Sequence, residues 1–306
     1  MKLLAGLEVT TKNVERTAEA IGVDMAAREQ QQTQGALQLD LPLILGEAVP
    51  VLYVQMDGTG IPVVKEETEG RPGKTDGQPA HTRQVKLGCV FTQTTGDEED
   101  YPICDPDSTP YVGAIETAAE FGQRLYLEAW KRGWSRAPKK VVLGDGSEWI
   151  WSQAQEHFPG APQIVATSIM RGNISGAWLA SCTRTMRAAR TVGCSCTKTC
   201  STRGKIEKPV SSPRSTETSR AVLADKIQTE AEYFDKNAGR MRYPEFRCQH
   251  LFVGTGVIEA GCKTVIGSRC KQSGIFWTVR GANAILALRC CPFNGRFEDY
   301  WEARRA

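Results

Sequence analysis

The sequence predicts an α/β fold in which helices flank a mixed β-sheet. Apolar, β-branched runs alternate with amphipathic helical patterns after an opening group of strands, which is typical of α/β domains. Two of the apolar runs end in an aspartate, at Asp57 and at Asp145. The chain has 306 residues, of which 41% are hydrophobic, so it can bury the core that such a sheet needs.

The first two expected strands lie at 51–56 and 61–64, on either side of the sequence Asp-Gly-Thr-Gly. Asp-Gly between apolar runs is a common hairpin signal, so this stretch predicts a tight turn with Asp57 at the end of its first strand. Residues 85–92 alternate enough to form a third strand.

Periodicity and glycine or proline signals predict the remaining elements. Three strands, a helix, a strand, a helix and a strand then outline a mixed sheet of the ribonuclease-H-like kind. The further expected segments are a helix at 8–34, an extended connector at 39–45, exposed loops at 65–82 and 97–107, helices at 113–133 and 147–158, strands at 139–144 and 163–165, and helices at 221–241 and 282–288.

Three acidic residues form the candidate site. Asp57 and Asp145 end apolar runs, and Glu259 follows a Gly-Thr-Gly break that precedes a helical pattern. Hard oxygen ligands from separate segments are what two divalent metal ions need in a phosphoryl-transfer site, an arrangement that suits nucleases. Each residue also has an ordinary structural explanation: Asp57 suits a hairpin, and Glu259 could pair with Lys263 one helical turn later.

Composition narrows the function classes. The formal net charge of +3 is compatible with nucleic-acid binding without arguing for it. No apolar run is long enough to cross a membrane, and the apolar start is too short for a secretory signal. We therefore expect a cytosolic protein whose eleven cysteines are mostly reduced thiols, since an odd number cannot all pair within one chain.

Four motifs, YVQMDGTG at 53–60, TDGQPAHTR at 75–83, GDGSEWIW at 144–151 and GVIEAGCK at 256–263, carry a family resemblance. Over most of 5–165 and 204–306 the chain closely resembles bacterial insertion-sequence transposases of the ISKra type. The resemblance implies a DDE transposase with a ribonuclease-H-like core and a helical insertion between the second Asp and the Glu.

By this resemblance Asp57, Asp145 and Glu259 are the catalytic triad and hold Mg²⁺, with Mn²⁺ as a substitute. The implied partners are DNA, as insertion-sequence ends and target DNA, and further copies of the chain in a homo-oligomer, with no membrane. The implied location is the nucleoid in the bacterial cytoplasm. Basic side chains would contact phosphates, although a solvated loop is the better explanation of Lys74 and His81. These residues are Lys74, His81, Arg83, Lys263, Arg269, Lys271 and Arg280.

The resemblance breaks between about 166 and 204. This stretch has no acidic residue and no sustained helical or strand period, which predicts disorder or coding sequence read in a shifted frame. A basic DNA-binding loop and a zinc site are alternatives, but the cysteine spacing contains no Cys-x-x-Cys pair and no histidine is nearby. The candidate zinc ligands are Cys182, Cys194, Cys196 and Cys200.

We therefore expect an N-terminal helical lead-in at 1–50 left from a truncated DNA-recognition region, a catalytic core at 51–165 and 205–306, and the aberrant segment 166–204. The leading functional hypothesis is a DDE transposase that cleaves element ends and transfers strands. A catalytically dead remnant that binds DNA non-specifically and a general metal-dependent nuclease are the alternatives.

Overall fold

The computed structural model describes residues 9–44, 48–73, 79–98, 101–166, 228–229 and 232–305. The chain divides into two compact units, one made of Met1–Met170 with Pro244–Ala306 and the other of Arg171–Tyr243. In the second unit, the described residues 228–229 and 232–237 are helical and lead into the short helix η2 (Ala238–Arg240). The sheet and the three candidate acids all belong to the first unit.

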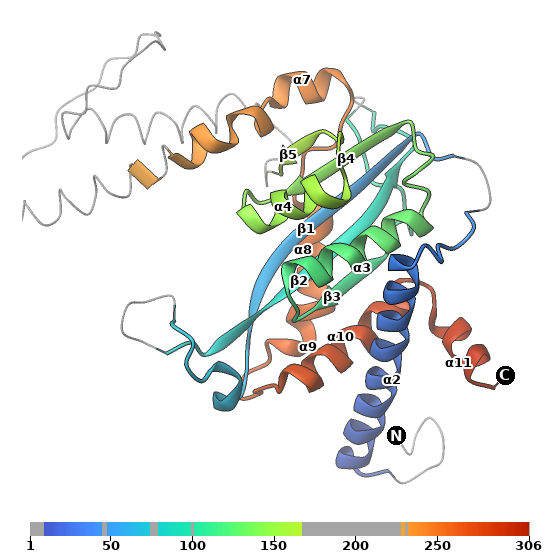
Figure 1. Ribbon diagram of the computed structural model, residues 1–306, viewed down its shortest axis with the longest axis vertical. Coiled ribbons are helices and arrows are strands. Elements are labelled where there is room, and N and C mark those ends of the chain that lie inside the picture. Colours follow the sequence, from blue (N-terminus) through green and yellow to red (C-terminus); the bar gives the residue numbers. More distant parts are fainter. Residues whose placement is uncertain are drawn as a thin grey trace, which may run out of the picture. The chain divides into compact units, whose positions relative to one another are not determined.

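The first unit is built on a five-stranded mixed sheet with the order β3-β2-β1-β4-β5 (Figure 1). β1 pairs antiparallel with β2, and β2 pairs antiparallel with β3. β4 pairs parallel with β1 and with β5, so the expected mixed α/β sheet is confirmed. The strands are β1 (Val51–Pro62), β2 (Thr82–Gln93), β3 (Tyr111–Ala114), β4 (Lys139–Gly144) and β5 (Gln163–Val165).

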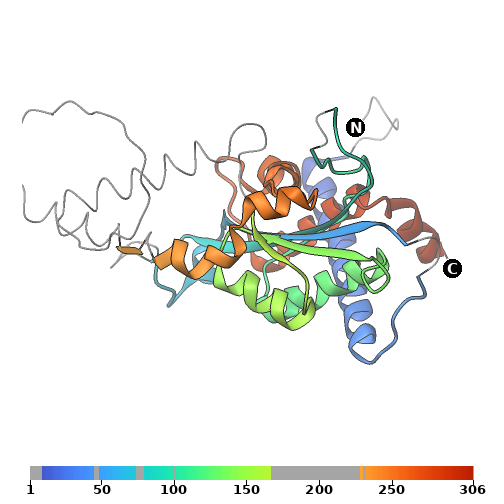
Figure 2. The same cartoon turned by 90° about the horizontal axis from the view of Figure 1, so that it is seen from above.

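Helices cover both faces of this sheet (Figure 2). Gly88 of β2 faces Leu125 of α3, whereas the preceding Leu87 faces Gly261 of α8, as the alternation of side chains along a strand requires. The helical segments are α2 (Thr11–Leu37), η1 (Lys65–Thr68), α3 (Ala118–Lys131), α4 (Glu148–His157), α7 (Tyr243–Cys248), α8 (Gly256–Gly261), the π-helix η3 (Cys262–Gly267), α9 (Ser268–Cys270), α10 (Val279–Phe293) and α11 (Phe297–Arg305).

The hairpin expected at Asp57 is wrong, because β1 runs straight through the Asp-Gly-Thr-Gly sequence and stays paired with β2 as far as Pro62. A two-residue hairpin turn needs glycines at positive φ, and neither Gly58 nor Gly60 has one. Gly58 instead allows a close approach, since a Cβ there would collide with the side chain of Gln84 on β2. The two expected strands are therefore one.

The helix expected at 113–133 begins later than predicted. Residues Tyr111–Ala114 form β3, and α3 starts only after Thr117, which makes a capping box with Glu120. In this box the Glu120 N–H donates to Thr117 Oγ1 over 3.3 Å, and the Thr117 N–H donates to Glu120 Oε2 over 2.9 Å. The count of five strands is right only because one expected strand merges into β1 and β3 replaces it.

Other expectations are met where the chain is described. The expected helices at 8–34, 147–158 and 282–288 correspond to α2, α4 and α10, and the expected strand at 163–165 is β5. Within the described ranges no cysteine forms a disulfide, and no helix is both long and apolar enough to cross a membrane. The segment 166–204, apart from Ala166, lies outside the described residues, as do its four candidate zinc ligands and residues 221–227 and 230–231 of the helix expected at 221–241.

Candidate active site beside β1 and β4

Asp57 and Asp145 occupy matching positions on two neighbouring parallel strands. Gln55 of β1 lies opposite Leu143 of β4 in the register of the sheet. Two residues further along each chain stand Asp57 and Asp145, the latter just after β4 ends at Gly144. Neighbouring strands are about 4.8 Å apart, so this register places the two residues near each other at one end of the β1–β4 pair, and the charge of Asp145 acts on Asp57. Asp57 is partly buried and Asp145 is exposed.

Glu259 reaches the same region from α8, which packs closely on the sheet. Gly261 makes this approach possible, because a Cβ there would collide with the ring of Tyr111 on β3. Tyr111 also donates a hydrogen bond from its hydroxyl to the carbonyl oxygen of Val257, over 3.3 Å. The sequence Gly-Thr-Gly therefore leads into a helix, as predicted, and that helix is held against β2 and β3.

The helix that carries Glu259 continues without a break into the π-helix η3. A π-helical turn leaves its carbonyls imperfectly aligned, and such turns are frequent at functional sites. Arg289 of α10 donates from Nε to the carbonyl oxygen of Val265 over 2.7 Å, and from Nη2 to the hydroxyl of Ser268 over 2.8 Å. The irregular turn is thus held in place by a charged side chain of α10.

Asp57 lies close enough to Asp145 and to Glu259 for both of their charges to act on it. Burial raises the pKa of Asp57, and the carboxylates of Asp145 and Glu259 raise it further, whereas a hydrogen bond from the Gly58 N–H lowers it. Asp57 thus holds its proton more tightly than an exposed aspartate does. Charge repulsion among three carboxylates is the condition that a bound cation relieves.

Each carboxylate is also held by donors from nearby in the fold. Carboxylate oxygens are hard ligands that fit Mg²⁺ or Mn²⁺ in chemistry. Among the described residues, however, no group of three His, Cys, Asp or Glu side chains is arranged to hold a metal ion. Cation binding would therefore require these side chains to turn toward one another. The donors are Gly58 N at 2.6 Å and Cys262 Sγ at 3.5 Å for Asp57, Ser147 N at 2.9 Å for Asp145, and Thr255 Oγ1 at 2.6 Å for Glu259.

Cys262 is a site neighbour that the sequence did not single out. Its thiol donates to Asp57, and burial raises its pKa to about 12, with a further contribution from Asp57, whereas Lys271 lowers it. The thiol is therefore protonated at neutral pH. Lys271, a predicted DNA-binding residue, thus lies in the neighbourhood of Asp57, and its ammonium group donates to the hydroxyl of Thr59 on β1.

The other basic residues predicted to bind DNA are placed differently. Arg269 lies over the ring of Trp277 at 5.3 Å, and Arg83 donates to the carbonyl oxygen of Glu67 over 3.1 Å. The first contact is an arginine packed on an aromatic ring inside the fold, which needs no nucleic acid. Of the remaining four, Lys263, His81 and Arg280 are exposed, and Lys74 lies outside the described residues.

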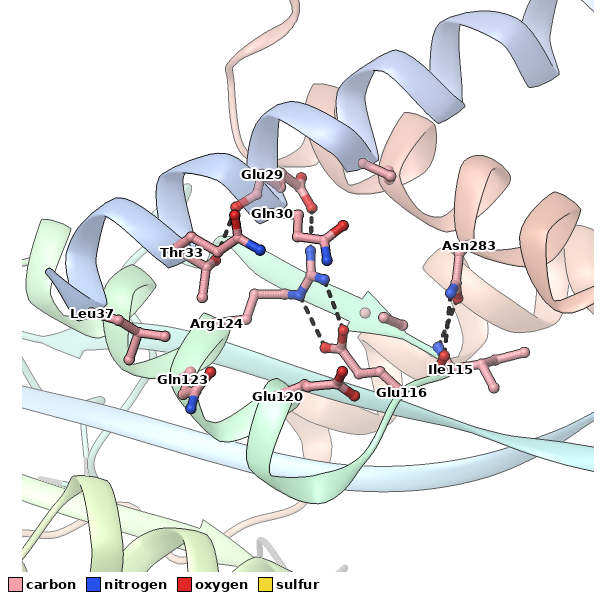
Figure 3. A pocket seen from close by; sticks show the side chains of 15 residues that line it. Glu29, Gln30, Thr33, Leu37, Ile115, Glu116, Glu120, Gln123, Arg124 and Asn283 are labelled. Carbon is pink, nitrogen blue, oxygen red and sulfur yellow. Dashed lines mark hydrogen bonds and ion pairs between the residues drawn. The ribbon is translucent and has the colours of Figure 1, made fainter.

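A separate pocket of about 500 Å³ lies between α2, α3, β3 and α10 (Figure 3). Arg124 stands between two carboxylates there, with Nη1 2.9 Å from Glu29 and Nη2 2.8 Å from Glu116. Asn283 bonds both the N–H and the carbonyl of Ile115. These groups satisfy one another, and none of the three candidate acids lines the pocket. We therefore place the candidate site at β1, β4 and α8.

Asp57 and Asp145 are 88 residues apart in the sequence, and Asp145 and Glu259 are 114 residues apart. In the structure the register of β1 and β4 places the first two near each other, and the charges of Asp145 and Glu259 both act on Asp57. The fold and this geometry carry the functional assignment below. Comparison with models of known protein families and with curated proteins finds no match for the chain.

Proposed function

We propose that the chain is a DNA transposase with a ribonuclease-H-like core that uses Asp57, Asp145 and Glu259 for metal-dependent phosphodiester chemistry. One observation carries the proposal: Asp57 and Asp145 each follow by two residues the last paired residues of β1 and β4, Gln55 and Leu143, and the charges of Asp145 and Glu259 both raise the pKa of Asp57. The antiparallel β1–β2–β3 group followed by the parallel β4 and β5 supports the ribonuclease-H-like part.

In this proposal the three carboxylates hold two divalent cations, Mg²⁺ or Mn²⁺. Such ions, when bound, activate an attacking hydroxyl and stabilise the leaving oxygen of a phosphodiester. Asp57 must lose its proton to act as a ligand, so protons compete with the cation at this residue. Lys271, held to Thr59 beside the acids, provides a positive charge that favours a phosphate of the DNA backbone.

The four sequence motifs support the narrower parts of the proposal. They favour insertion-sequence ends and target DNA as substrates, with water and then a freed DNA hydroxyl as the attacking groups. They also favour a homo-oligomer as the active form and a place at the nucleoid of a bacterial cytoplasm. These features rest on the resemblance of the motifs and need the experiment below.

A second candidate is a remnant that binds DNA without cutting it. The observation that favours this candidate is that each carboxylate is engaged by donors of its own surroundings and that the described residues form no ready metal-ligand group. Such a protein would bind DNA through its basic surface, and the affinity would fall steeply with salt.

The test is cleavage of DNA that carries the sequences flanking the gene, with and without Mg²⁺. Asp57→Asn, Asp145→Asn and Glu259→Gln should each lower metal-dependent cleavage by about 100-fold or more, because even outer-shell partners of metal ligands are worth about 10- to 100-fold. Asp40→Asn and Glu66→Gln make the same chemical changes at exposed positions and should cut like the parent.

The outcomes separate the candidates. If Asp57→Asn cuts as fast as the parent, the site is assigned wrongly. Salt-sensitive binding by the parent without any metal-dependent cleavage would favour the inactive remnant. Efficient cutting of DNA without element ends would identify a general nuclease of the same fold.

A further inference from the structure

Three buried polar side chains of β1 and β2 hold the backbone that leads into α8. Gln55 donates from Nε2 to the carbonyl oxygen of Gly254 over 3.0 Å. Tyr53 accepts a hydrogen bond on its hydroxyl from the N–H of Phe252 over 2.9 Å and donates to Oε1 of Gln93. Gln93 in turn donates from Nε2 to the carbonyl oxygen of His250 over 2.9 Å. We call Tyr53, Gln55 and Gln93 the β1–β2 polar cluster.

Two residues of this cluster lie on the same face of β1 as Asp57 of the candidate site. Tyr53, Gln55 and Asp57 are alternate residues of β1, so they project from the same face of the strand. On the other side, Gly254 directly precedes Thr255, the N-cap residue of α8, whose hydroxyl donates to Glu259. The cluster therefore joins the strand that carries one acid to the start of the helix that carries another.

The energetics of Gln55 argue against a role in stability alone. Its side chain is fully buried, between the buried apolar residues Val54 and Met56 of the strand, and its Oε1 has no hydrogen-bond partner among the described residues. An unpaired buried acceptor costs about 1–3 kcal/mol, so a well-packed apolar side chain would suit the core better. What the amide contributes is its bond to Gly254.

Aromatic ring contacts hold the same backbone in addition to the hydrogen bonds of the cluster. The ring of Phe252 lies edge-on to Phe91 with 5.4 Å between centroids, and to Tyr53 with 6.2 Å. Loss of one hydrogen bond should therefore loosen this stretch while leaving it folded onto the sheet. Small polar changes in the cluster are consequently suitable probes of geometry.

We propose that Tyr53, Gln55 and Gln93 are positioning residues that fix the start of α8 and thereby the placement of Glu259 relative to Asp57. The chain re-enters the first unit at Pro244 after the second unit. The cluster then anchors residues 250–254 to the sheet before the helix starts, so the position of Glu259 depends on this anchor. The part concerning metal binding rests on the proposed function.

The experiment compares Gln55→Met with Gln153→Met. Gln153 of α4 is a matched control, because it is also buried and its Oε1 also has no partner among the described residues. Amide hydrogen exchange over 250–259 is measured in the metal-free, full-length protein. Mn²⁺ affinity and the dependence of cleavage on Mg²⁺ are measured in parallel.

We expect Gln55→Met to exchange faster at 250–259 and to bind Mn²⁺ about 10- to 100-fold more weakly, as for other outer-shell partners. Saturating metal should restore much of the cleavage rate, and DNA affinity without metal should stay at the parental value. Gln153→Met should change none of these quantities. If Gln55 had a purely structural role, Gln55→Met would lower the thermal stability. It would not weaken Mn²⁺ binding while leaving the cleavage rate at saturating metal near the parental value.

The proposal is overturned if amides 250–259 exchange in Gln55→Met at the same rate as in the parent. It is also overturned if they exchange faster but Gln55→Met binds Mn²⁺ as tightly as a parent that binds the metal. If the parent neither binds Mn²⁺ nor cuts DNA, the proposed function fails, and exchange alone still decides whether the cluster fixes the start of α8. If Gln55→Met does not fold, Tyr53→Phe decides the question in the same way, since it removes the acceptor of the Phe252 N–H and the donor to Gln93 Oε1 while keeping the ring.

Discussion

Asp57 combines burial with two neighbouring carboxylates, so its folded-state pKa is raised. A carboxyl group of this kind binds its proton more tightly in the folded than in the unfolded state, and folding stability falls as pH rises through the folded-state pKa. In metal-free protein at neutral pH, Asp57→Asn should therefore be more stable than the parent. We expect its Tm in EDTA to be roughly 2–4 °C higher, equivalent to about 1 kcal/mol.

The matching control is the exposed Asp40→Asn, which should melt with the parent. The advantage of Asp57→Asn should also shrink as the pH is lowered to the raised pKa of Asp57, because the parental carboxylate then takes up its proton. A lower Tm for Asp57→Asn at neutral pH would mean that this carboxylate stabilises the fold, which is the opposite of what a charge-crowded site predicts.

The sequence revealed some of these residues and hid others for a physical reason. Asp57 and Asp145 stand out because each ends an apolar run, which is a local pattern. Gln55 interrupts such a run and could have signalled a buried hydrogen bond, but its partner Gly254 lies 199 positions away. A sequence pattern covers only neighbouring residues and cannot relate positions so far apart. The β1–β2 polar cluster is therefore recognised only in the folded structure.

The closeness of α8 to the sheet depends on Gly261. A methyl group there would collide with the Tyr111 ring and crowd Leu87, and the ring is fixed by the bond from its hydroxyl to Val257. Gly261→Ala should therefore destabilise the protein by about 1–3 kcal/mol, typical of overpacking, although alanine favours a helix. Urea unfolding measures the change in the free energy of unfolding.

Gly239→Ala is the control for Gly261→Ala, since nothing lies within 4 Å of a Cβ at that position. It should leave the free energy of unfolding near the parental value. If Gly261→Ala and the parent were equally stable, α8 could move away from β3 at no cost in free energy. The close packing of α8 on the sheet would then not be what places Glu259 in the site.

Elements with a clear period were predictable, and those that contradict a local signal were not. The α4 helix and the β5 strand follow directly from their apolar spacing and the prolines between them. In β1, the Asp-Gly signal favours a turn, but pairing with all of β2 outweighs it. β3 has only four residues, and the helical spacing that continues into α3 conceals it.

At the scale of the whole unit, α2 is joined to the C-terminal helices. Gly22 of α2 packs directly against the backbone of Ala284 on α10, and a Cβ at Gly22 would collide with the Ala284 carbonyl group. Backbone cannot yield as a flexible side chain can, so Gly22→Ala should force the two helices apart. We expect a loss of about 2 kcal/mol or more in the free energy of unfolding, measured by urea or thermal denaturation.

Gly35→Ala tests the same substitution in the same helix at a position where the nearest atom, Asp40 Oδ2, is 3.6 Å away. It should be neutral or slightly stabilising, because alanine is the better helix former. If Gly22→Ala matched it, α2 would be a loosely attached segment. The sequence could predict that α2 is a helix but not its packing on α10, since the two are some 260 positions apart.

The register of β1 against β4 has one more consequence, which concerns how this gene can change. Side chains alternate between the two faces of a sheet. The two aspartates therefore lie on the same side only while each follows the last residue of its strand in the β1–β4 pairing, Gln55 or Leu143, by an even number of residues. Residues can be gained or lost in the connection between α3 and β4 without disturbing that match. A single codon inserted between Leu143 and Asp145 would turn the second carboxylate away from the first, although every residue of the site would still be encoded.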